Sequence, residues 1–236
     1  MLISGAEVHR VEESINRMCY AFGAKRVDVF IITSSMVVTV YTVEGETFTQ
    51  TRRVTSMKFN IERLHRLNQL SREICEHKLS ADEIDSRLNQ AVRCGQFPAW
   101  AEFLSCSVIA GAFTLFFGGN WIESVISFFV GALVWVCLFA ADQIIPTKIF
   151  SKFYASAIAT LLAFITVRLG WIDSMDKIII GNIMTLIPGI GLTNAIRDLF
   201  TGDSIAGLLR LIDAVLIALA IAAGYYLIAV PGGFFL

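Results

Sequence analysis

The sequence predicts an α-helical polytopic membrane protein that carries a small α+β domain at its N-terminus. Three observations lead to this fold class: hydrophobic residues make up 56% of the 236-residue chain and charged residues only 17%, the charges gather in the first part of the chain, and long apolar segments follow them. A soluble domain usually has about 25% charged residues. Part of the surface of this chain therefore faces a solvent other than water.

The charges divide the chain into two domains. Residues 1–98 hold 13 of the 19 lysines and arginines and 12 of the 20 aspartates and glutamates. We therefore expect an α+β domain over residues 1–98 and a five-span transmembrane domain over residues 99–236. The stretch Met1–Arg10 lacks the apolar core of a signal peptide, so the N-terminal domain is expected to stay in the cytosol.

The N-terminal domain is expected to begin with a helix and three strands. Apolar residues recur every three or four positions over Gly5–Phe22, which predicts an amphipathic helix. Runs rich in β-branched and aromatic residues predict strands over Val27–Thr33, Met36–Val43 and Thr47–Val54. The connections between these runs are short enough for hairpins, so the three strands should form an antiparallel sheet.

Two further helices complete the predicted N-terminal domain. Asn60 can cap a helix that reaches about Lys78. Ser80 and Glu83 have the spacing of a capping box, which predicts another helix ending near Val92. A small sheet covered by helices on one face would bury this pattern.

Five apolar segments then approach the span length of about 20 residues. They are Phe103–Gly119, Trp121–Ala141, Ile149–Val167, Ile178–Ile187 and Ile205–Val230. The fourth segment is short, and Pro188 interrupts it. With the N-terminal domain inside, six lysines and arginines flank the inner ends and two lie in outer loops, which predicts a C-terminus outside.

The interrupted fourth segment is the first candidate site. Pro188 lacks a backbone donor, and glycine allows backbone angles closed to other residues, so a helix should break at Pro188-Gly189. A new helix should begin near Leu192–Ala195, where free amides and the positive end of the helix dipole favour an anion. The hypothesis is that a substrate carboxylate binds there, with these candidate residues: Gly189, Gly191, Thr193, Asn194 and Arg197. The alternative is a kinked span whose backbone is satisfied.

The start of the last span is the second candidate site. Arg210 and Asp213 lie three residues apart and therefore share a helix face. Counted from Ile205, Asp213 would lie about 12 Å into the span at 1.5 Å per residue, and an ionisable group at that depth should face the protein interior. Together with Asp198, these two residues are candidates for ion or proton coupling. Alternatively, Arg210 and Asp213 form a pair that locks the helix.

No catalytic residue, cofactor or metal site is expected. His9 and Glu13 are helix neighbours that could support acid–base chemistry, but a solvated charged face explains them better. The sequence has no HExxH, nucleophile elbow or phosphate loop. The five cysteines form no CxxC pair, and the net charge of −1 argues against a nucleic-acid partner.

Two motifs resemble the threonine/serine exporter family. The first is Ser4-Gly5-Ala6-Glu7 followed by Arg10-Val11-Glu12. The second is a membrane signature: Pro188-Gly189, Leu192-Thr193-Asn194-Ala195, Arg197-Asp198, Gly202-Asp203, Gly207 and Arg210. Together they make the resemblance specific, and it covers essentially the whole chain.

The resemblance implies a bacterial exporter of threonine and serine or, in a related two-subunit system, of succinate. It implies a location in the bacterial inner membrane and a second, smaller membrane subunit as partner, since the chain is similar to the split form of the family. Without an ATP-binding loop, energy would come from an ion or proton gradient. The alternative function is a membrane-anchored sensory or regulatory domain with passive spans, which would not need polar residues beside a broken span.

Overall fold

The computed structural model describes residues 1–55, 57, 59–93, 97–144, 147–172 and 175–231. The chain forms two compact units. The head unit consists of Met1–Gln96 and Ile190–Ile212, and the membrane unit consists of Phe97–Gly189 and Asp213–Leu236. These two units are defined by contacts within the chain. The domain boundary predicted at residue 98 separates a part in water from a part in the membrane, and it stays a prediction.

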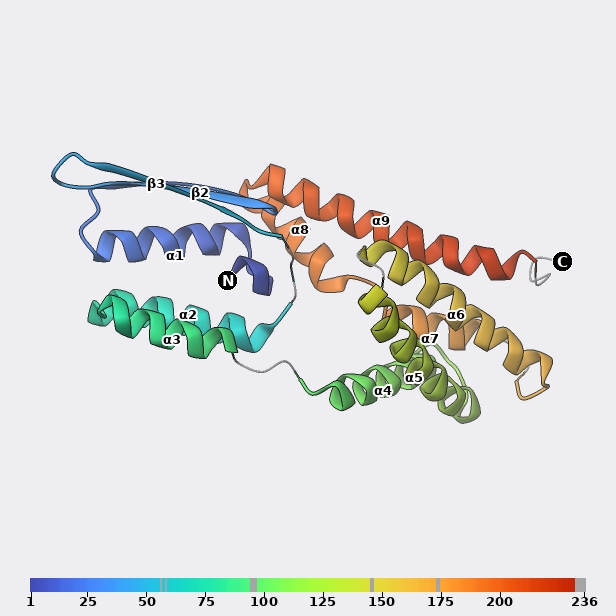
Figure 1. The fold of residues 1–236 in the computed structure, drawn as a ribbon. Helices are drawn as coiled ribbons and strands as arrows, with labels where there is room; N and C mark the ends of the chain where they lie inside the picture. The colour runs from blue at the N-terminus through green and yellow to red at the C-terminus, as the bar shows by residue number, and fades with distance from the viewer. Residues whose placement is uncertain (56, 58, 94–96, 145–146, 173–174, 232–236) are drawn as a thin grey trace. The chain divides into compact units, whose positions relative to one another are not determined.

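The head unit contains the predicted three-stranded antiparallel sheet. Its strands are β1 (Arg26–Ile32), β2 (Ser35–Tyr41) and β3 (Thr47–Arg53), in the order β1-β2-β3. Val27 pairs with Val40, which pairs with Phe48, so these residues lie on one face. Helix α1 (Val8–Ala21) lies between the sheet and helices α2 (Ile61–His77) and α3 (Ala81–Arg93) (Figure 1). β3 is exposed along its whole length, as its polar sequence predicts for an edge strand.

The first helix begins three residues later than its periodicity predicts. A short 3₁₀ turn, η1 (Leu2–Ser4), precedes it and ends at Gly5, whose φ of 94° is left-handed. A left-handed residue cannot continue into an α-helix, so Gly5–Glu7 form a connecting loop. Val8 and Val11 on α1 pack with Leu2, Ile31 and Ala206 in the core of the head unit.

Both predicted helix caps are confirmed. Asn60 caps α2 (Ile61–His77), because its Oδ1 accepts a hydrogen bond from the Arg63 amide at 2.8 Å. At the start of α3 (Ala81–Arg93), the Ser80 amide donates to Glu83 Oε2 at 3.0 Å, and the Glu83 amide donates to Ser80 Oγ at 3.4 Å. These reciprocal bonds satisfy amides that the first turn of a helix leaves without partners.

In the part of the chain that the structure describes, six helices follow the N-terminal segment. They are α4 (Ala99–Phe116), α5 (Trp121–Ile144), α6 (Lys148–Arg168), α7 (Asp176–Met184), α8 (Gly189–Thr201) and α9 (Ser204–Ala229). Among the described residues, four helices are long and apolar enough to cross a membrane, and the count rises to five if α7 and α8 form one broken span. The fold is thus mostly helical, with four or five candidate spans.

Small and polar residues bring α4, α5 and α7 together in the membrane unit. Asn182 on α7 is fully buried, and its Nδ2 donates to Ser127 Oγ on α5 at 2.9 Å. Ser127 Oγ lies 2.7 Å from Thr114 Oγ1 on α4. Gly181 lies so close to α4 that a Cβ atom would come within 2.2 Å of Thr114 Oγ1. Such contacts are typical of helix packing in membranes, where small residues allow close approach.

Candidate functional site

The predicted break in the fourth apolar segment is present. Helix α7 ends at Met184 and α8 begins at Gly189, directly after Pro188. Proline suits the start of a helix because its missing donor would have no partner there. The predicted start near Leu192–Ala195 is therefore wrong, since those residues lie one turn inside α8. Backbone amides at such positions bond to carbonyls four residues earlier, so they are not free for a solute. At the start of α8, the Gly189 amide donates to the Ile187 carbonyl at 2.9 Å.

One face of α8 contacts the loop that precedes α1. Asn194, Arg197 and Asp198 follow one another at helical spacing and therefore point in similar directions. The Asn194 side chain donates from Nδ2 to the Gly5 carbonyl at 3.0 Å. The Arg197 guanidinium forms an ion pair with the Glu7 carboxylate. We call these three residues, with Arg210 on α9 and the segment Gly5–Val8, the docking cluster.

Asp198 and Arg210 form the buried centre of the docking cluster. Asp198 has no exposed surface, Arg210 is 6% exposed, and Arg210 Nη1 lies 3.0 Å from Asp198 Oδ2. Arg210 also donates from Nη2 to the Ala6 carbonyl at 2.9 Å. The amide of Val8 donates to Asp198 Oδ1 at 3.4 Å, although 190 residues separate them in the sequence.

Asp198 supplies the first turn of α1 with an acceptor that the local sequence does not provide. Glu7 is the N-cap residue of α1, and its side chain forms no capping hydrogen bond. The Asp198 carboxylate takes this place, with its negative charge at the positive end of the helix dipole. A residue from the second motif thus completes a helix that begins with the first motif.

Asp213 lies apart from this cluster. It is exposed and, within the described part of the chain, forms no ion pair; Arg210 pairs with Asp198 instead. Asp213 is also the first residue of α9 that groups with the membrane unit, because Ser204–Ile212 group with the head unit. The depth counted from Ile205 therefore includes residues that pack with the head.

Gly189, Gly191 and Thr193 complete the predicted set. They lie in the first five residues of α8, and a Cβ atom at Gly189 would meet nothing within 4 Å. Sequence reasoning missed the partners in the docking cluster: Gly5, Ala6, Glu7 and Val8. The signal that could have found them is the presence of two separate motifs in one chain, each rich in polar or small residues.

Acidic residues also gather beside the turn between α8 and α9. A cavity of about 180 Å³ is lined there by Glu12, Asp203 and the first residues of α9. Burial raises the pKa of the Glu12 carboxyl above its ordinary value of 4.5, the Asp203 carboxylate raises it further, and His9 opposes the rise. Across the described ranges, no group of three or more His, Cys, Asp or Glu side chains has the arrangement of a metal site.

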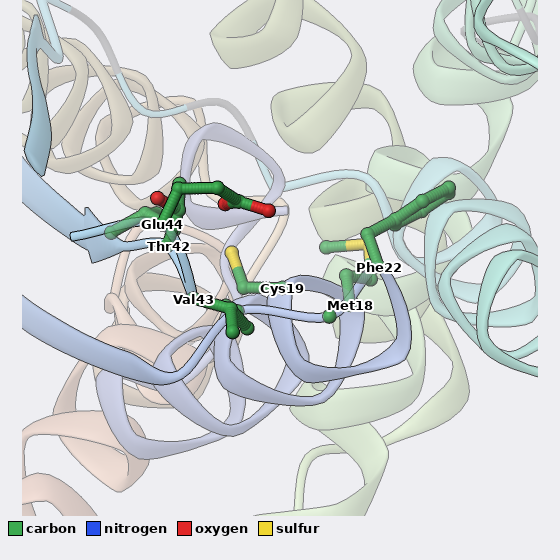
Figure 2. A pocket seen from close by; sticks show the side chains of 9 residues that line it. Met18, Cys19, Phe22, Thr42, Val43 and Glu44 are labelled. Carbon is green, nitrogen blue, oxygen red and sulfur yellow. The ribbon is translucent and has the colours of Figure 1, made fainter. Parts of the chain in front are cut away.

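A separate hollow of about 370 Å³ lies at the far end of α1. Figure 2 shows the residues that line it: Met18 and Cys19 from the end of α1, Phe22 directly after that helix, and Thr42, Val43 and Glu44 after β2. Burial raises the pKa of the Cys19 thiol, which opposes the thiolate form that a nucleophile requires. On the same helix, Glu13 forms an exposed ion pair with Arg17. Neither feature supports acid–base or nucleophilic chemistry.

The fold and the site define a multi-pass membrane protein whose head unit includes polar residues from α8 and from the last helix. Comparison with known proteins agrees with this class. Residues 1–230 match the ThrE family, described as "Putative threonine/serine exporter". The chain belongs to this family of membrane transport proteins. No solved structure matches the chain.

Several relatives from bacteria and yeasts match almost the whole chain. The "Probable succinate transporter subunit YjjP" of Klebsiella aerogenes is 26% identical over 230 residues, which cover 95% of this chain and 86% of the relative. The "Probable threonine/serine exporter" of Mycobacterium tuberculosis is 23% identical over 95% of this chain and 42% of its own length. The "Pheromone-regulated membrane protein 10" of Eremothecium gossypii is 24% identical over 94% of this chain and 30% of its own length.

Proposed function

We propose that this chain is one subunit of a secondary transporter that exports small carboxylate-bearing metabolites across the bacterial cytoplasmic membrane. The N-terminal domain would lie in the cytosol and the C-terminus outside. The observation that carries the proposal is the docking cluster, in which Asn194, Arg197 and Asp198 of the interrupted span are held against the head. A passive membrane anchor has no need of such contacts.

The guanidinium of Arg197 is the proposed binding group for the substrate carboxylate. Arginine can form two parallel hydrogen bonds to a carboxylate, and the Arg197 side chain is 57% exposed, so a solute can reach it. Gly189 and Gly191 lie in the first turn of α8 and are proposed to contribute through the positive end of the helix dipole, which favours an anion. Asn194 and Thr193 line the same helix and are proposed to orient the solute.

Coupling to an ion or proton gradient is assigned to the charged residues near the start of α9. Asp198 and Arg210 would transmit movement of α8 to the head, because their buried contact joins α8, α9 and the loop before α1. Asp213 is the proposed proton-carrying group, since it is exposed where the membrane unit begins on α9. An exposed charge on a span requires cover from other protein, which supports a second membrane subunit.

Efflux from preloaded cells tests the proposal. Threonine, serine and succinate efflux should be measured with this chain alone, with a candidate partner subunit, and with both. We expect efflux only with both chains. Arg197→Ala should lower it by about tenfold or more, because a charge-assisted hydrogen bond to the carboxylate is lost, while the protein still inserts.

Glu62→Gln is a matched control, since Glu62 forms an exposed ion pair with Arg66 on α2, away from the docking cluster. It should leave efflux unchanged. Wild-type efflux in the Arg197→Ala variant would remove Arg197 from the mechanism. Absence of efflux for every solute, with both chains inserted, would contradict the transport proposal and favour a sensory or regulatory head.

A further inference from the structure

Helices α1 and α2 lie side by side in the head unit (Figure 1), and both line a polar hollow. The hollow has a volume of about 390 Å³, and pockets for small molecules measure about 300–1,000 Å³. Every lining side chain except that of Cys75 is polar or charged. The charged ones are Arg10, Glu13 and Arg17 from α1 and Arg72 and Glu76 from α2. The hollow is therefore suited to a hydrophilic ligand.

Packing between the two helices does not explain this polar lining. The lining residues recur every three or four positions on each helix, so each set forms one stripe. Helices usually pack through apolar stripes, and α1 and α2 also have apolar contacts. Met18 of α1 packs against the cluster that contains Leu70, and Leu64 of α2 packs against the cluster that contains Val8. Because these contacts hold the helices together, the polar stripes are available for another role.

The charges of the lining favour an anion. Three guanidinium groups line the hollow and only two carboxylates do, so one net positive charge remains. Arg17 forms an ion pair with Glu13. Among the residues that the structure describes, no ion pair includes Arg10 or Arg72. The hollow thus presents two guanidinium groups from different helices without a carboxylate partner.

Two serines add polar surface and little bulk to the lining. Ser71 is 7% exposed, and its hydroxyl donates to the Asn68 carbonyl at 2.7 Å. The Ser14 hydroxyl donates to the Arg10 carbonyl at 2.8 Å. Both hydroxyl hydrogens are therefore used within their own helices, and the guanidinium groups are the main donors for a ligand.

We propose that this hollow, which we call the arginine pocket, binds a small phosphorylated metabolite. A guanidinium group can form two parallel hydrogen bonds to a phosphate. A phosphate monoester carries a charge of about −1.5 to −2 at pH 7 and has three acceptor oxygens, so Arg10 and Arg72 can share it. A single carboxylate has one charge and two oxygens, which one guanidinium group already satisfies. The proposal does not depend on the proposed export function.

Isothermal titration calorimetry on the full chain in detergent and phosphate-free buffer tests the arginine pocket. The probes are glycerol 3-phosphate, glutarate, which carries a similar charge on two carboxylates, and glycerol, which lacks the phosphate. We expect glycerol 3-phosphate to bind at least about tenfold more tightly than glutarate, the factor for one further charge-assisted hydrogen bond. Glycerol should not bind measurably.

Arg10→Gln and Arg72→Gln should each weaken the binding of glycerol 3-phosphate by about tenfold or more, because one charge-assisted contact is lost. Both arginines are exposed, so both variants should fold. The matched control is Arg66→Gln on α2, since Arg66 pairs with Glu62 and does not line the arginine pocket. It should leave the dissociation constant unchanged.

Glu13→Gln has an expected effect of opposite sign. It removes a negative charge from the lining and releases Arg17 from its ion pair. Glycerol 3-phosphate should then bind about two- to fivefold more tightly, the factor that corresponds to an exposed ion pair. Weaker binding in this variant would contradict the role assigned to the net positive charge.

Two results would overturn the proposal. The first is no binding of glycerol 3-phosphate to the wild type, or binding that Arg10→Gln and Arg72→Gln both leave unchanged. The second is glutarate binding as tightly as glycerol 3-phosphate in an Arg72-dependent manner, which would make the arginine pocket a carboxylate site. Glutarate bound at the proposed substrate site is recognised because Arg72→Gln does not affect it.

Discussion

The docking cluster combines a buried ion pair with an exposed arginine. Asp198 and Arg210 are almost entirely buried. Asp198 also accepts a hydrogen bond from the amide of Val8, the first residue of α1, and Arg210 donates to the Ala6 carbonyl in the loop before it. Removing one partner of a buried ion pair typically costs about 3–5 kcal/mol, because the other charge stays buried without compensation. Arg197 is more than half exposed and is much less costly to replace. Loss of export in variants of Asp198 or Arg210 must therefore be compared with their stability, whereas Arg197 variants report more directly on the solute.

Glu12 gives the head unit a predicted pH dependence. Burial and the nearby Asp203 carboxylate raise the pKa of Glu12 in the folded state, so folding favours its protonated form. Its contribution to stability is present below the ordinary value of 4.5 and is lost as the pH rises through the raised value. We expect Glu12→Gln to raise the thermal midpoint of the purified chain at pH 7, with a difference that shrinks toward pH 4.

A matched comparison is available on the same helix. Glu13→Gln removes an exposed carboxylate whose partner is Arg17, so its midpoint should follow the wild type or lie slightly below it at pH 7. If Glu12→Gln proved less stable than the wild type at pH 7, the charged form of Glu12 would be the favoured one. The assignment of burial and Asp203 as the dominant influences would then be wrong.

Among the helices, the interruption between α7 and α8 was predictable from the sequence, but the residue at which α8 begins was not. Pro188 and the glycines predict a break, and the break is present. The position of the new helix start was misjudged, because Gly189 and Gly191 adopt helical geometry after Pro188 instead of prolonging the break. Glycine permits both conformations, and the sequence alone does not show which one packing selects.

The local elements of the head followed from the sequence, whereas its long-range contacts did not. The three strands, the Asn60 cap and the Ser80–Glu83 capping box depend on neighbouring residues and were all predicted. The contact between Val8 and Asp198 joins residues 190 positions apart. No periodicity or spacing rule reaches that far, so the sequence offers Arg210 only its helix neighbour Asp213 as a possible partner, which was one of two alternatives.

The packing of α7 against α4 depends on Gly181. A Cβ atom there would lie 2.2 Å from Thr114 Oγ1 and 2.8 Å from the Ala110 carbonyl oxygen. Because the second contact is with backbone, it cannot be relieved by a side-chain rotation. We expect Gly181→Ala to destabilise the membrane unit by about 1–3 kcal/mol, the usual cost of overpacking, which a lower thermal midpoint in detergent would show.

Gly189→Ala is the matched substitution for this stability measurement. Gly189 is also helical, and a Cβ atom there would meet nothing within 4 Å. Alanine has a higher helix propensity than glycine, so the thermal midpoint of the Gly189→Ala variant should equal or exceed that of the wild type. Equal midpoints for the two alanine variants would mean that α4 and α7 can separate without cost, which the close contact at Gly181 contradicts.

At the scale of the whole molecule, the head is completed by a distant part of the chain. Residues Ile190–Ile212 group with Met1–Gln96, and Ala206 on α9 belongs to the same apolar core as Val8 and Ile31. The loop before α1 also depends on α8 and α9 for its hydrogen bonds. Helix α9 contributes to the core of the head and continues into a candidate membrane span. It is therefore suited to transmit a conformational change between the head and that span.

This arrangement predicts that residues 1–98 alone do not form the complete head. Without residues 190–212, the Val8 amide loses its acceptor and the apolar surface around Val8 and Ile31 loses the cover of Ala206. We expect a fragment of residues 1–98 to unfold at a lower temperature than the same fragment joined by a flexible linker to residues 190–212.

Hydrogen exchange at the Val8 amide should be slower in the joined fragment, because an amide with a buried acceptor is protected. Placing Asp198→Ala in the joined fragment should restore fast exchange at Val8 even where the apolar cover remains. Equal exchange at Val8 in all three proteins would mean that the head folds independently of α8 and α9, and the proposed route from the head to the broken span would lose its physical basis.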